Sequence, residues 1–418
     1  MNRVVITGIG SVTPLSINFR RSWPLVKAGG TGIGPLTRIN QNSLSKTMKW
    51  LAAGEIKGLE TAEHFSKKEL NYIDPCNVYA VLAGLESAEN AGLLSRDKKV
   101  TDQCGIILGS SRGGIMSIER EFMKLSHSHS ENETQNVRGR VSPFLMPAST
   151  ICAAATSTGA KLGITGYALG ISNACASGAN AIGEAFRMIR NGTATLMLAG
   201  GAEAPLCRIC IEGYGAMGAL SESVPDNASR PFDIGRDGFV LSEGACVITL
   251  EAMESALSRN AYILAEIIGY SNICDAAHLT MPSLKGEVLA MRESIRDAGI
   301  SPGDVDYVNT HGTSTIAGDK TEAAAINKVF SNRRIPCSSI KSMTGHMLAA
   351  SGAFEVACTA MSLNEGIITP TINTHNIDPE CGINLITDAS EFPMDIAITN
   401  SFGFGGVNAV LTLKRFRS

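Results

Sequence analysis

The segment Ser172-Asn173-Ala174-Cys175-Ala176-Ser177-Gly178-Ala179 joins an extended run to a helix. Strand-like residues end at Ser172 and small residues follow, which predicts that Cys175 lies at or next to a helix N-terminus. Unpaired N–H groups and the positive end of the helix dipole favour a thiolate there. A buried, inert thiol is the alternative reading, and this segment alone leaves both open.

The tetrapeptide Ala-Ser-Gly-Ala occurs at 176–179 and again at 350–353, each time opening an Ala-rich helix. This repeat indicates two similar halves, an N-terminal half (1–255) that carries Cys175 and a C-terminal half (256–418). Short Val/Ile-rich runs alternate with Ala-rich helical stretches, which predicts sheets covered by helices on both faces, an α/β layered fold. The predicted strands are Val4–Thr7, Gly105–Leu108, Ala194–Ala199, Cys246–Leu250, Ile263–Ile268, Tyr307–Thr310, Ile335–Cys337, Ile396–Thr399 and Ala409–Leu413.

Composition narrows the class of protein. A chain of 418 residues with 44% hydrophobic and 18% charged residues is typical of a well-buried globular protein. A net charge of -3 gives no reason to expect nucleic acid or an anionic membrane as a partner. Eleven scattered cysteines favour reduced thiols and a cytoplasmic location, and no apolar stretch approaches the ~20 residues of a membrane helix.

Two histidines lie beside glycines at the ends of predicted elements. His311 follows the strand Tyr307–Thr310, and His346 precedes an Ala-rich helix at 347–364. Catalytic groups are often displayed at such positions on a rigid sheet. Together with Cys175 and the Gly-rich turn Phe402-Gly403-Phe404-Gly405-Gly406, they form a candidate active site in which the C-terminal half supplies both histidines.

The chain resembles the β-ketoacyl-acyl-carrier-protein synthases of the elongating type, which belong to the thiolase superfamily. The resemblance covers nearly the whole chain and rests on the ordered motifs ACASG, GGAEA, SRPFDIGRDGFVLSEGA, NTHGTSTIAGDKTEA, SIKSMTGHMLAASG and NSFGFGG. It implies a thiolase-like five-layer α-β-α-β-α fold made of two similar halves. It also implies a homodimer that works with acyl carrier protein.

The resemblance assigns roles residue by residue. Cys175 is the acyl-accepting nucleophile, and His311 and His346 stabilise the enolate formed when malonyl thioester loses carbon dioxide. In the supporting positions, Lys341 and Glu355 orient the histidines, and Phe404 gates the site and supplies an oxyanion-hole N–H. The implied substrate-binding residues are Thr313, Thr315, Phe402 and Arg112.

The same resemblance implies no metal and no cofactor beyond the phosphopantetheine of the carrier protein. Some members hold a structural monovalent cation at positions that match Asn309, Glu355 and Asn400.

Arg112 departs from the family pattern, because common members have an apolar residue at this end of the acyl pocket. An unpaired buried guanidinium is costly. We therefore expect Arg112 to pair with Glu119 or Glu121, and a shortened, polar pocket is the alternative. A second departure is Asn71, Tyr72 and Gly218 at positions where basic residues are common, which favours a dedicated carrier protein.

The predicted function is decarboxylative Claisen condensation of an acyl group on Cys175 with malonyl carrier protein, in fatty-acid or polyketide/polyene biosynthesis. The alternative is the catalytic ketosynthase subunit of a heterodimer with a chain-length-factor paralogue in a type II polyketide pathway. A non-elongating acyl-binding scaffold is the third reading. A thiolase would need a second Cys near the C-terminus, and none follows Cys381.

Overall fold

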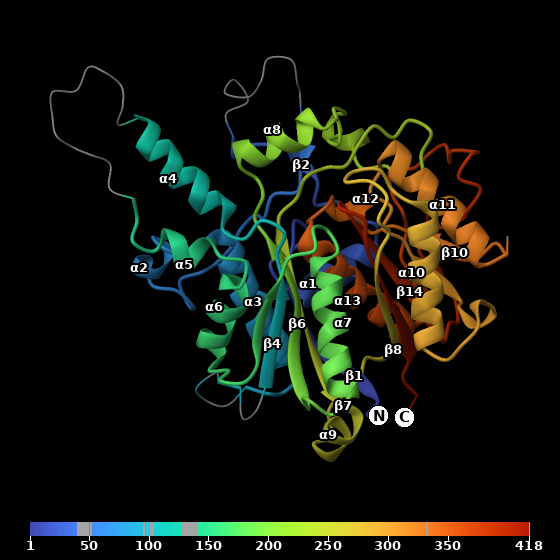
Figure 1. Ribbon diagram of the computed structural model, residues 1–418, viewed down its shortest axis with the longest axis horizontal. Helices are drawn as coiled ribbons and strands as arrows, with labels where there is room; N and C mark the ends of the chain where they lie inside the picture. Colours follow the sequence, from blue (N-terminus) through green and yellow to red (C-terminus); the bar gives the residue numbers. More distant parts are fainter. Residues whose placement is uncertain are drawn as a thin grey trace.

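The computed structural model describes residues 1–39, 50, 52–94, 97, 99–100, 104–127, 141–331 and 333–417. Its centre is one mixed sheet of eleven strands (Figure 1). These strands are β1 (Val4–Val12), β4 (Cys104–Gly109), β5 (Ala168–Ile171), β6 (Leu196–Glu203), β7 (Gly244–Ala252), β8 (Ala265–Cys274), β9 (Tyr307–Asn309), β10 (Pro336–Ser338), β12 (Asn384–Leu385), β14 (Ile396–Gly403) and β15 (Val407–Arg415). Two small sheets pair β2 (Gly34–Pro35) with β3 (Ala52–Ala53) and β11 (Ile367–Ile368) with β13 (Ser390–Glu391).

The strand order of the sheet repeats. The first half runs β5-β4-β6-β7-β1 and the second runs β10-β9-β14-β15-β8, with β12 added at the outer edge. Numbered within each half along the chain, both orders are 3-2-4-5-1. The halves meet where Val4–Ile6 of β1 pairs with Ala265–Ile267 of β8. Two similar halves are therefore confirmed, while a boundary at residue 255 stays a prediction.

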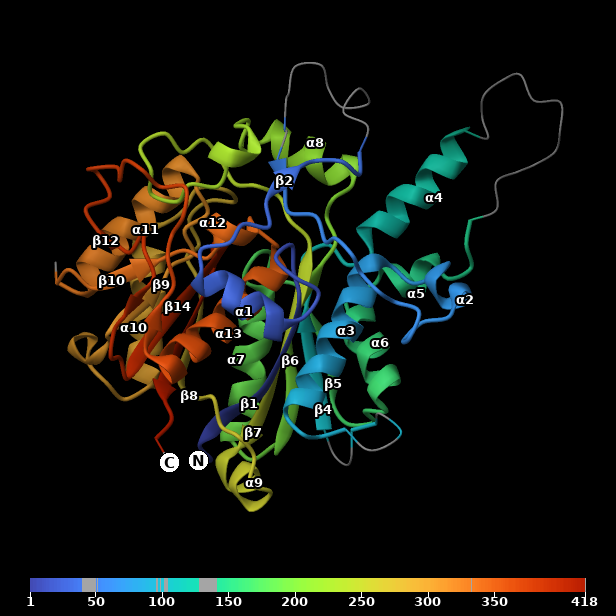
Figure 2. The same cartoon turned by 180° about the vertical axis from the view of Figure 1, so that it is seen from behind.

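Helices divide the molecule into five layers, which Figures 1 and 2 show from opposite sides. On the outer face of the first half, α3 (Pro75–Asn90) packs on β1, β6 and β7, and α6 (Ala153–Leu162) packs on α3. Between the halves lie α7 (Ser177–Arg190) and α13 (Ala349–Glu365), which contact each other and strands of the sheet. The second half is covered by α10 (Leu284–Asp297) and α11 (Ile316–Val329). The predicted α-β-α-β-α order is confirmed.

Further helices lie around this core. They are α1 (Phe19–Lys27), α2 (Lys67–Leu70), α4 (Ile115–His127), α5 (Leu145–Ser149), α8 (Arg208–Ala216), α9 (Met253–Ser258) and α12 (Lys341–Thr344). Within the described ranges, none of the helices has the length and apolar character needed to cross a membrane.

The two central helices approach each other closely because small residues line their contact. A Cβ on Gly178 would lie 2.2 Å from the carbonyl oxygen of Ala349, and one on Gly352 would lie 3.1 Å from Ala179 Cβ. Both glycines belong to the repeated tetrapeptide. The repeat therefore brings the start of α7 next to the start of α13, and with them the segments that carry Cys175 and His346.

The strands predicted from the sequence are all present, with ends shifted by a few residues. β5 was not among them because its four residues are partly exposed and lack a Val/Ile-rich run. Its position matters, since it forms one edge of the eleven-stranded sheet.

Candidate active site

A strained turn presents Cys175 at the start of α7. Ala174 has a positive φ of 48°, in the left-handed region that most side chains avoid. Ser177 Oγ holds the turn by accepting from the Asn173 N–H at 2.8 Å and donating to the Ala174 carbonyl at 2.6 Å. Cys175 is only 6% exposed. The predicted location beside the helix N-terminus is confirmed.

His311 is fixed through its backbone by a buried carboxylate. It lies two residues beyond β9, where its N–H and that of Gly312 each donate to Glu322 at 2.8 Å. Asn400 Nδ2 also donates to Glu322, at 2.9 Å. We did not predict this role for Glu322 from the sequence, although it belongs to the quoted motif NTHGTSTIAGDKTEA.

His346 is held from both sides of its peptide. Its N–H donates to the Val240 carbonyl at 2.7 Å, and its carbonyl accepts from the Ser242 N–H at 3.0 Å. Ser351 Oγ accepts from the Met347 N–H at 2.8 Å and lies 3.2 Å from His346 Nδ1. Because that hydroxyl already accepts, its own proton is free to bond Nδ1, which leaves the proton of a neutral imidazole on Nε2. Ser351 is a second residue that sequence reasoning missed.

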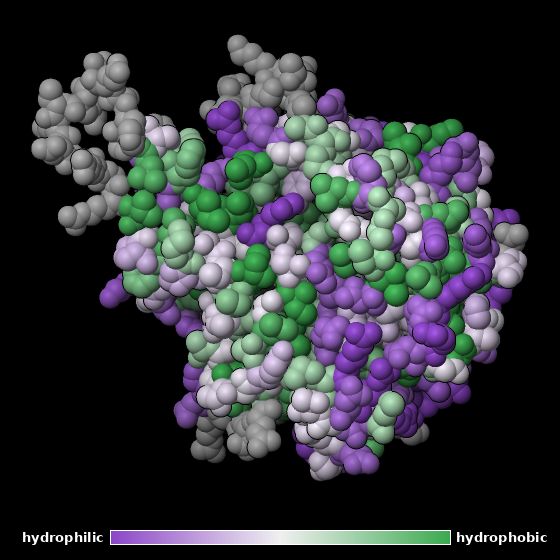
Figure 3. Space-filling model, in the orientation of Figure 1, coloured by the Kyte–Doolittle hydropathy of each residue, from purple (hydrophilic) through white to green (hydrophobic). Residues whose placement is uncertain are grey.

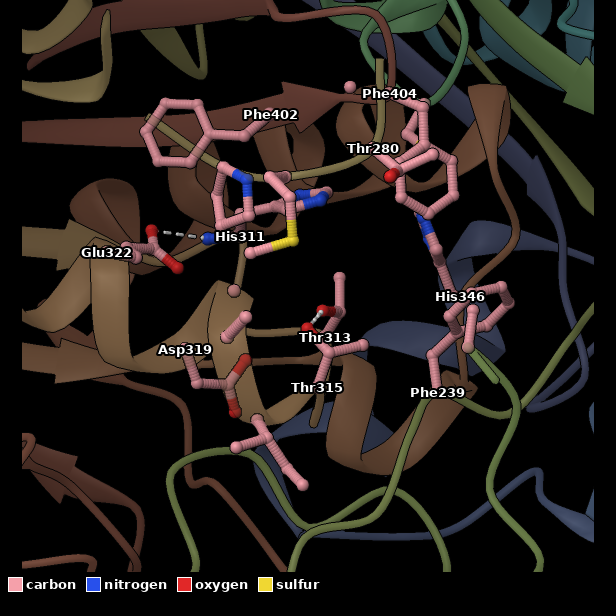
Figure 4. Close-up of a pocket in the computed structure, with 18 of the residues that line it drawn as sticks. Phe239, Thr280, His311, Thr313, Thr315, Asp319, Glu322, His346, Phe402 and Phe404 are labelled. Atoms are coloured by element: carbon pink, nitrogen blue, oxygen red, sulfur yellow. Dashed lines mark hydrogen bonds between the residues drawn. The ribbon is translucent and has the colours of Figure 1, made fainter. Parts of the chain in front are cut away.

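One cavity of about 330 Å³ brings the nucleophile and both histidines together. The rings of His311 and His346 lie 5.5 Å apart between centroids and almost perpendicular, at 84°. Figure 4 shows Phe402 beside His311 and Phe239 beside His346, with centroid distances of 5.9 Å and 5.3 Å. Aromatic walls exclude water and strengthen the hydrogen bonds that these imidazoles can form.

Lys341 and Glu355 form a buried ion pair behind the histidines, as the resemblance implies. Lys341 Nζ also lies 3.3 Å from His311 Nδ1. An ammonium can only donate, so Nδ1 accepts and the neutral ring carries its proton on Nε2. Burial raises the pKa of the Glu355 carboxyl to about 7, against the opposing charge of Lys341.

Both imidazoles are electrostatically held neutral. Burial is the main cause that places the pKa of His311 well below its ordinary value, and the charges of Lys341 and His346 act in the same direction. Burial and Lys341 also lower the pKa of His346 well below 6.5. The site therefore presents two neutral hydrogen-bond donors, which suits stabilisation of a developing enolate oxygen.

The sequence left open whether Cys175 is a thiolate or a buried thiol, and the structure favours the thiol. Burial raises the pKa of the thiol to about 11, although the charge of Lys341 and the Phe404 N–H lower it. Burial raises the pKa more than the helix terminus lowers it, because a thiolate in this buried cluster loses its hydration. The resting group is therefore a thiol at neutral pH.

This thiol should show a steep pH dependence of alkylation. We expect the rate of iodoacetamide reaction at Cys175 to rise about tenfold per pH unit from about pH 6 to 9, since the thiolate fraction grows in that proportion below the pKa. Peptide mass spectrometry measures the rate of alkylation at Cys175. The exposed Cys274 in the same digest shows that the reagent is active at each pH. A plateau that begins near pH 7 would contradict a raised pKa.

The remaining predicted residues lie at the same cavity, with one exception. Phe402, Phe404, Thr313 and Thr315 all line it, and the two threonine hydroxyls are 3.0 Å apart. The Phe404 N–H is close enough to the Cys175 sulfur to lower the pKa of the thiol. Arg112 is the exception, because it does not line this cavity.

The expected partners of Arg112 are wrong. Glu119 accepts from the backbone N–H groups at the start of α8, and Glu121 pairs with Lys124. Arg112 Nε and Nη2 donate instead to Tyr214 Oη, at 3.2 Å and 3.1 Å. The exposed guanidinium does not need a carboxylate, because water and a phenol already satisfy part of it. The polar-pocket alternative therefore remains.

Comparison with known proteins places this geometry in a family. Residues 1–256 match the beta-ketoacyl synthase N-terminal domain, and residues 264–375 match the C-terminal domain. The chain belongs to the β-ketoacyl synthase family. This synthase is 39% identical over 422 residues to 3-oxoacyl-[acyl-carrier-protein] synthase 2 of Staphylococcus aureus strain N315, with 100% of this chain and 99% of the relative covered.

Solved structures of the family share the fold of this synthase. The ishigamide ketosynthase/chain length factor has a TM-score of 0.91 and 31% identity, with both chains covered completely. A type II polyketide synthase ketosynthase, bound to the hexaketide and in complex with its acyl-carrier protein, has a TM-score of 0.88 and 30% identity. The match covers 99% of this chain and 100% of that chain.

Proposed function

We propose that this synthase condenses an acyl group held on Cys175 with a malonyl group carried by acyl carrier protein. The products are 3-oxoacyl carrier protein, carbon dioxide and free carrier protein. The observation that carries the proposal is one cavity that contains a buried thiol and two neutral imidazoles. Names of relatives, such as 3-oxoacyl-[acyl-carrier-protein] synthase 2, agree with this acyltransferase activity.

The first half-reaction is transthioesterification. Cys175 Sγ attacks the carbonyl carbon of the incoming thioester, and the bond from that carbon to the carrier sulfur breaks. The thiol proton ends on the departing carrier sulfur, so no net charge develops. The backbone N–H groups of Phe404 and Cys175 would hold the oxyanion, and the Phe404 N–H is already close enough to the sulfur to lower the pKa of the thiol.

The second half-reaction needs the histidines. The carboxylate of the malonyl group leaves as carbon dioxide, and its electron pair moves into an enolate whose oxygen accepts from Nε2–H of His311 and His346. The enolate carbon then attacks the acyl carbonyl carbon, and the bond to Cys175 Sγ breaks. The released thiolate takes a proton from solvent, which closes the cycle.

The cavity also suits a pantetheine arm. Thr313 and Thr315, which line the cavity, would bond its amides, and Phe402 and Phe404 would flank its path to the thiol. Movement of Phe404 would admit the malonyl thioester. Gly405 and Gly406 have φ values of 83° and 74°, a conformation that glycine adopts without strain, so the turn behind Phe404 can rearrange.

A structural monovalent cation fits the donor set. Glu355 Oε2 and Asn400 Oδ1 are buried side-chain oxygens without a hydrogen-bond partner in the structure. Asn309 Oδ1 lies on the neighbouring strand, where it accepts from Thr399 at 3.2 Å. Hard oxygen donors of this kind suit sodium or potassium. The ion would neutralise orphaned oxygens and takes no part in the chemistry.

The proposed partner at the sheet edge is a second copy of this chain. β5 ends the eleven-stranded sheet, and Figure 3 shows hydrophobic residues gathered on the side that carries α4 and α5. An exposed strand edge beside apolar surface is typical of an interface. The exposed residues are Ile118, Phe122, Phe144, Met146, Tyr167 and Leu169. A monomeric mass for the purified chain would instead favour the heterodimer with a chain-length factor.

The pathway can be fatty-acid or polyketide synthesis. Similarity to the Staphylococcus aureus enzyme favours the first, whereas the ishigamide and type II polyketide ketosynthases favour the second. A non-elongating acyl-binding scaffold would leave the paired neutral histidines without a task.

The decisive experiment is mass spectrometry of Cys175 after incubation with acyl thioesters, followed by addition of malonyl carrier protein. We expect the acyl mass on the peptide that contains Cys175 and then 3-oxoacyl product. Cys175→Ala should lose product formation by at least about 10³-fold. Cys274→Ser is the matched control, because that cysteine is exposed and outside the cavity. Undiminished condensation by Cys175→Ala would refute the proposal.

A further inference from the structure

Cys175 also packs among residues that do not line the cavity of the histidines, and these residues form its second side. It belongs to a buried cluster that includes Leu206, Cys210 and Tyr214, and none of these three lines that cavity. During condensation the acyl group on Cys175 and the malonyl thioester occupy the site together. The histidine cavity takes the malonyl group, so an acyl chain that leaves this cavity from Cys175 would pass these residues.

Arg112 and Tyr214 make this second side polar. The loop that carries Arg112 follows β4 and is anchored by the buried Glu203, which accepts from the N–H groups of Ser111 and Arg112 at 2.8 Å and 3.0 Å. The guanidinium then reaches Tyr214 with two hydrogen bonds to its hydroxyl, and its carbon lies 5.6 Å from the ring centre.

The pair is close enough to the nucleophile to affect it. The positive charge of Arg112 is one of the influences that lower the pKa of the Cys175 thiol against burial. Tyr214 also contacts Phe239 at 5.6 Å between centroids, and Phe239 contacts His346. The polar pair therefore belongs to the wall of the reaction site rather than to a remote surface.

The guanidinium has hydrogen-bonding capacity to spare. Of its five N–H groups, the structure uses two on Tyr214 Oη. Among the described residues Arg112 forms no ion pair, and the carboxylate of Glu203 is already occupied by Ser110 and Ser111. A plain hydrocarbon chain laid along this wall would strip water from N–H groups and return no acceptor.

We propose that Arg112 and Tyr214 select acyl chains that carry an acceptor oxygen, either a carbonyl or a carboxylate, beyond the thioester carbonyl. The inference rests on the proposed function and adds the substrate class. The planar fork of Arg112 can bond one or two oxygens, and the Tyr214 hydroxyl can join them. Sites that bond a substrate oxygen reject the analogue that lacks it, because their own polar groups are then left unpaired.

The test compares three acyl thioesters of equal chain length on one carrier, an unsubstituted chain, a keto chain and a chain that ends in a carboxylate. The rate of acylation of Cys175, followed by intact mass, is the readout. We expect an oxygenated chain to react at least about tenfold faster than the unsubstituted one. Preference for the carboxylate identifies a charged ligand, and preference for the ketone identifies a neutral one.

Variants of the two residues test whether they recognise the oxygen of the acyl chain. Arg112→Met should slow acylation by the oxygenated chain about 10- to 100-fold and raise acylation by the unsubstituted chain, which inverts the ratio. Tyr214→Phe should move the ratio in the same direction by less. Arg208→Met is the matched control on α8, since its exposed side chain pairs with Glu212 and should leave the ratio unchanged.

Two outcomes would overturn the inference. Equal acylation by all three thioesters, with the same ratio in Arg112→Met, would remove the selectivity while the proposed function stands. Absence of acylation by every thioester would remove the proposed function and the inference together.

Discussion

Cys175→Gln should abolish condensation and keep decarboxylation. A glutamine amide cannot accept an acyl group, so 3-oxoacyl product should fall by at least about 10³-fold. Its carbonyl can occupy the place of a bound acyl thioester, near the Phe404 N–H that lowers the pKa of the Cys175 thiol. The malonyl group still meets His311 and His346 in a water-poor cavity, so release of carbon dioxide should persist or rise.

The measurement sets carbon dioxide release against 3-oxoacyl product. Cys175→Ser is the informative comparison, because a hydroxyl neither accepts the acyl group readily nor imitates the acylated state, so both activities should be low. Cys274→Gln introduces the same amide at an exposed cysteine and should keep both. If Cys175→Gln melts at the parental temperature and releases no carbon dioxide, decarboxylation is not a separable step.

His311→Ala and His346→Ala should each reduce decarboxylation about 10²- to 10³-fold, which is the usual effect of removing one donor to a developing oxyanion. The Cys175→Gln background is the sharpest place to measure this, because acyl transfer then contributes nothing. His375→Ala is the control, since that histidine is exposed and lies outside the cavity. If Cys175→Gln combined with His311→Ala or with His346→Ala decarboxylates at the rate of Cys175→Gln alone, the histidine that was replaced has no part in the mechanism.

The same histidines predict the pH profile of decarboxylation. A group with a lowered pKa keeps its neutral form above that pKa and loses it only as the pH falls through the lowered value. Because burial places both pKa values well below 6.5, the rate in Cys175→Gln should be nearly constant from about pH 6 to 8. A rate that halves near pH 6.5 would mean that an imidazole titrates there as in water.

Local sequence pattern was sufficient to predict the strands, the two similar halves and the candidate site residues of this protein. Continuous Val/Ile-rich runs between Ala-rich stretches predicted the strands, because strands covered by helices on both sides must be apolar on both faces. The repeated Ala-Ser-Gly-Ala predicted two halves, and the identical strand orders confirm it. Cys175, His311 and His346 could be chosen because each lies beside small residues at an element end, and the ordered motifs of the family supplied their roles.

Tertiary contacts decided the rest. The carboxylate that fixes His311, the hydroxyl beside His346 and the phenol that receives Arg112 are each supplied by a different helix, and Arg112 and Tyr214 lie 102 residues apart in the chain. Glu322 and Ser351 are near His311 and His346 in the chain, yet no periodicity or spacing indicates that these side chains meet the histidines. The partner of Arg112 was therefore predicted wrongly from nearby acids.

The protonation of Cys175 also depends partly on local sequence and partly on tertiary structure. The residues around Cys175 determined that it starts a helix, and that local feature alone favours a thiolate. Its protonation depends on how much water remains around the sulfur, which is set by segments as distant as Tyr214, Phe239 and Phe404 that pack over it. Local sequence determined where the thiol is placed, whereas only the tertiary structure, by removing solvent, decided that it rests protonated.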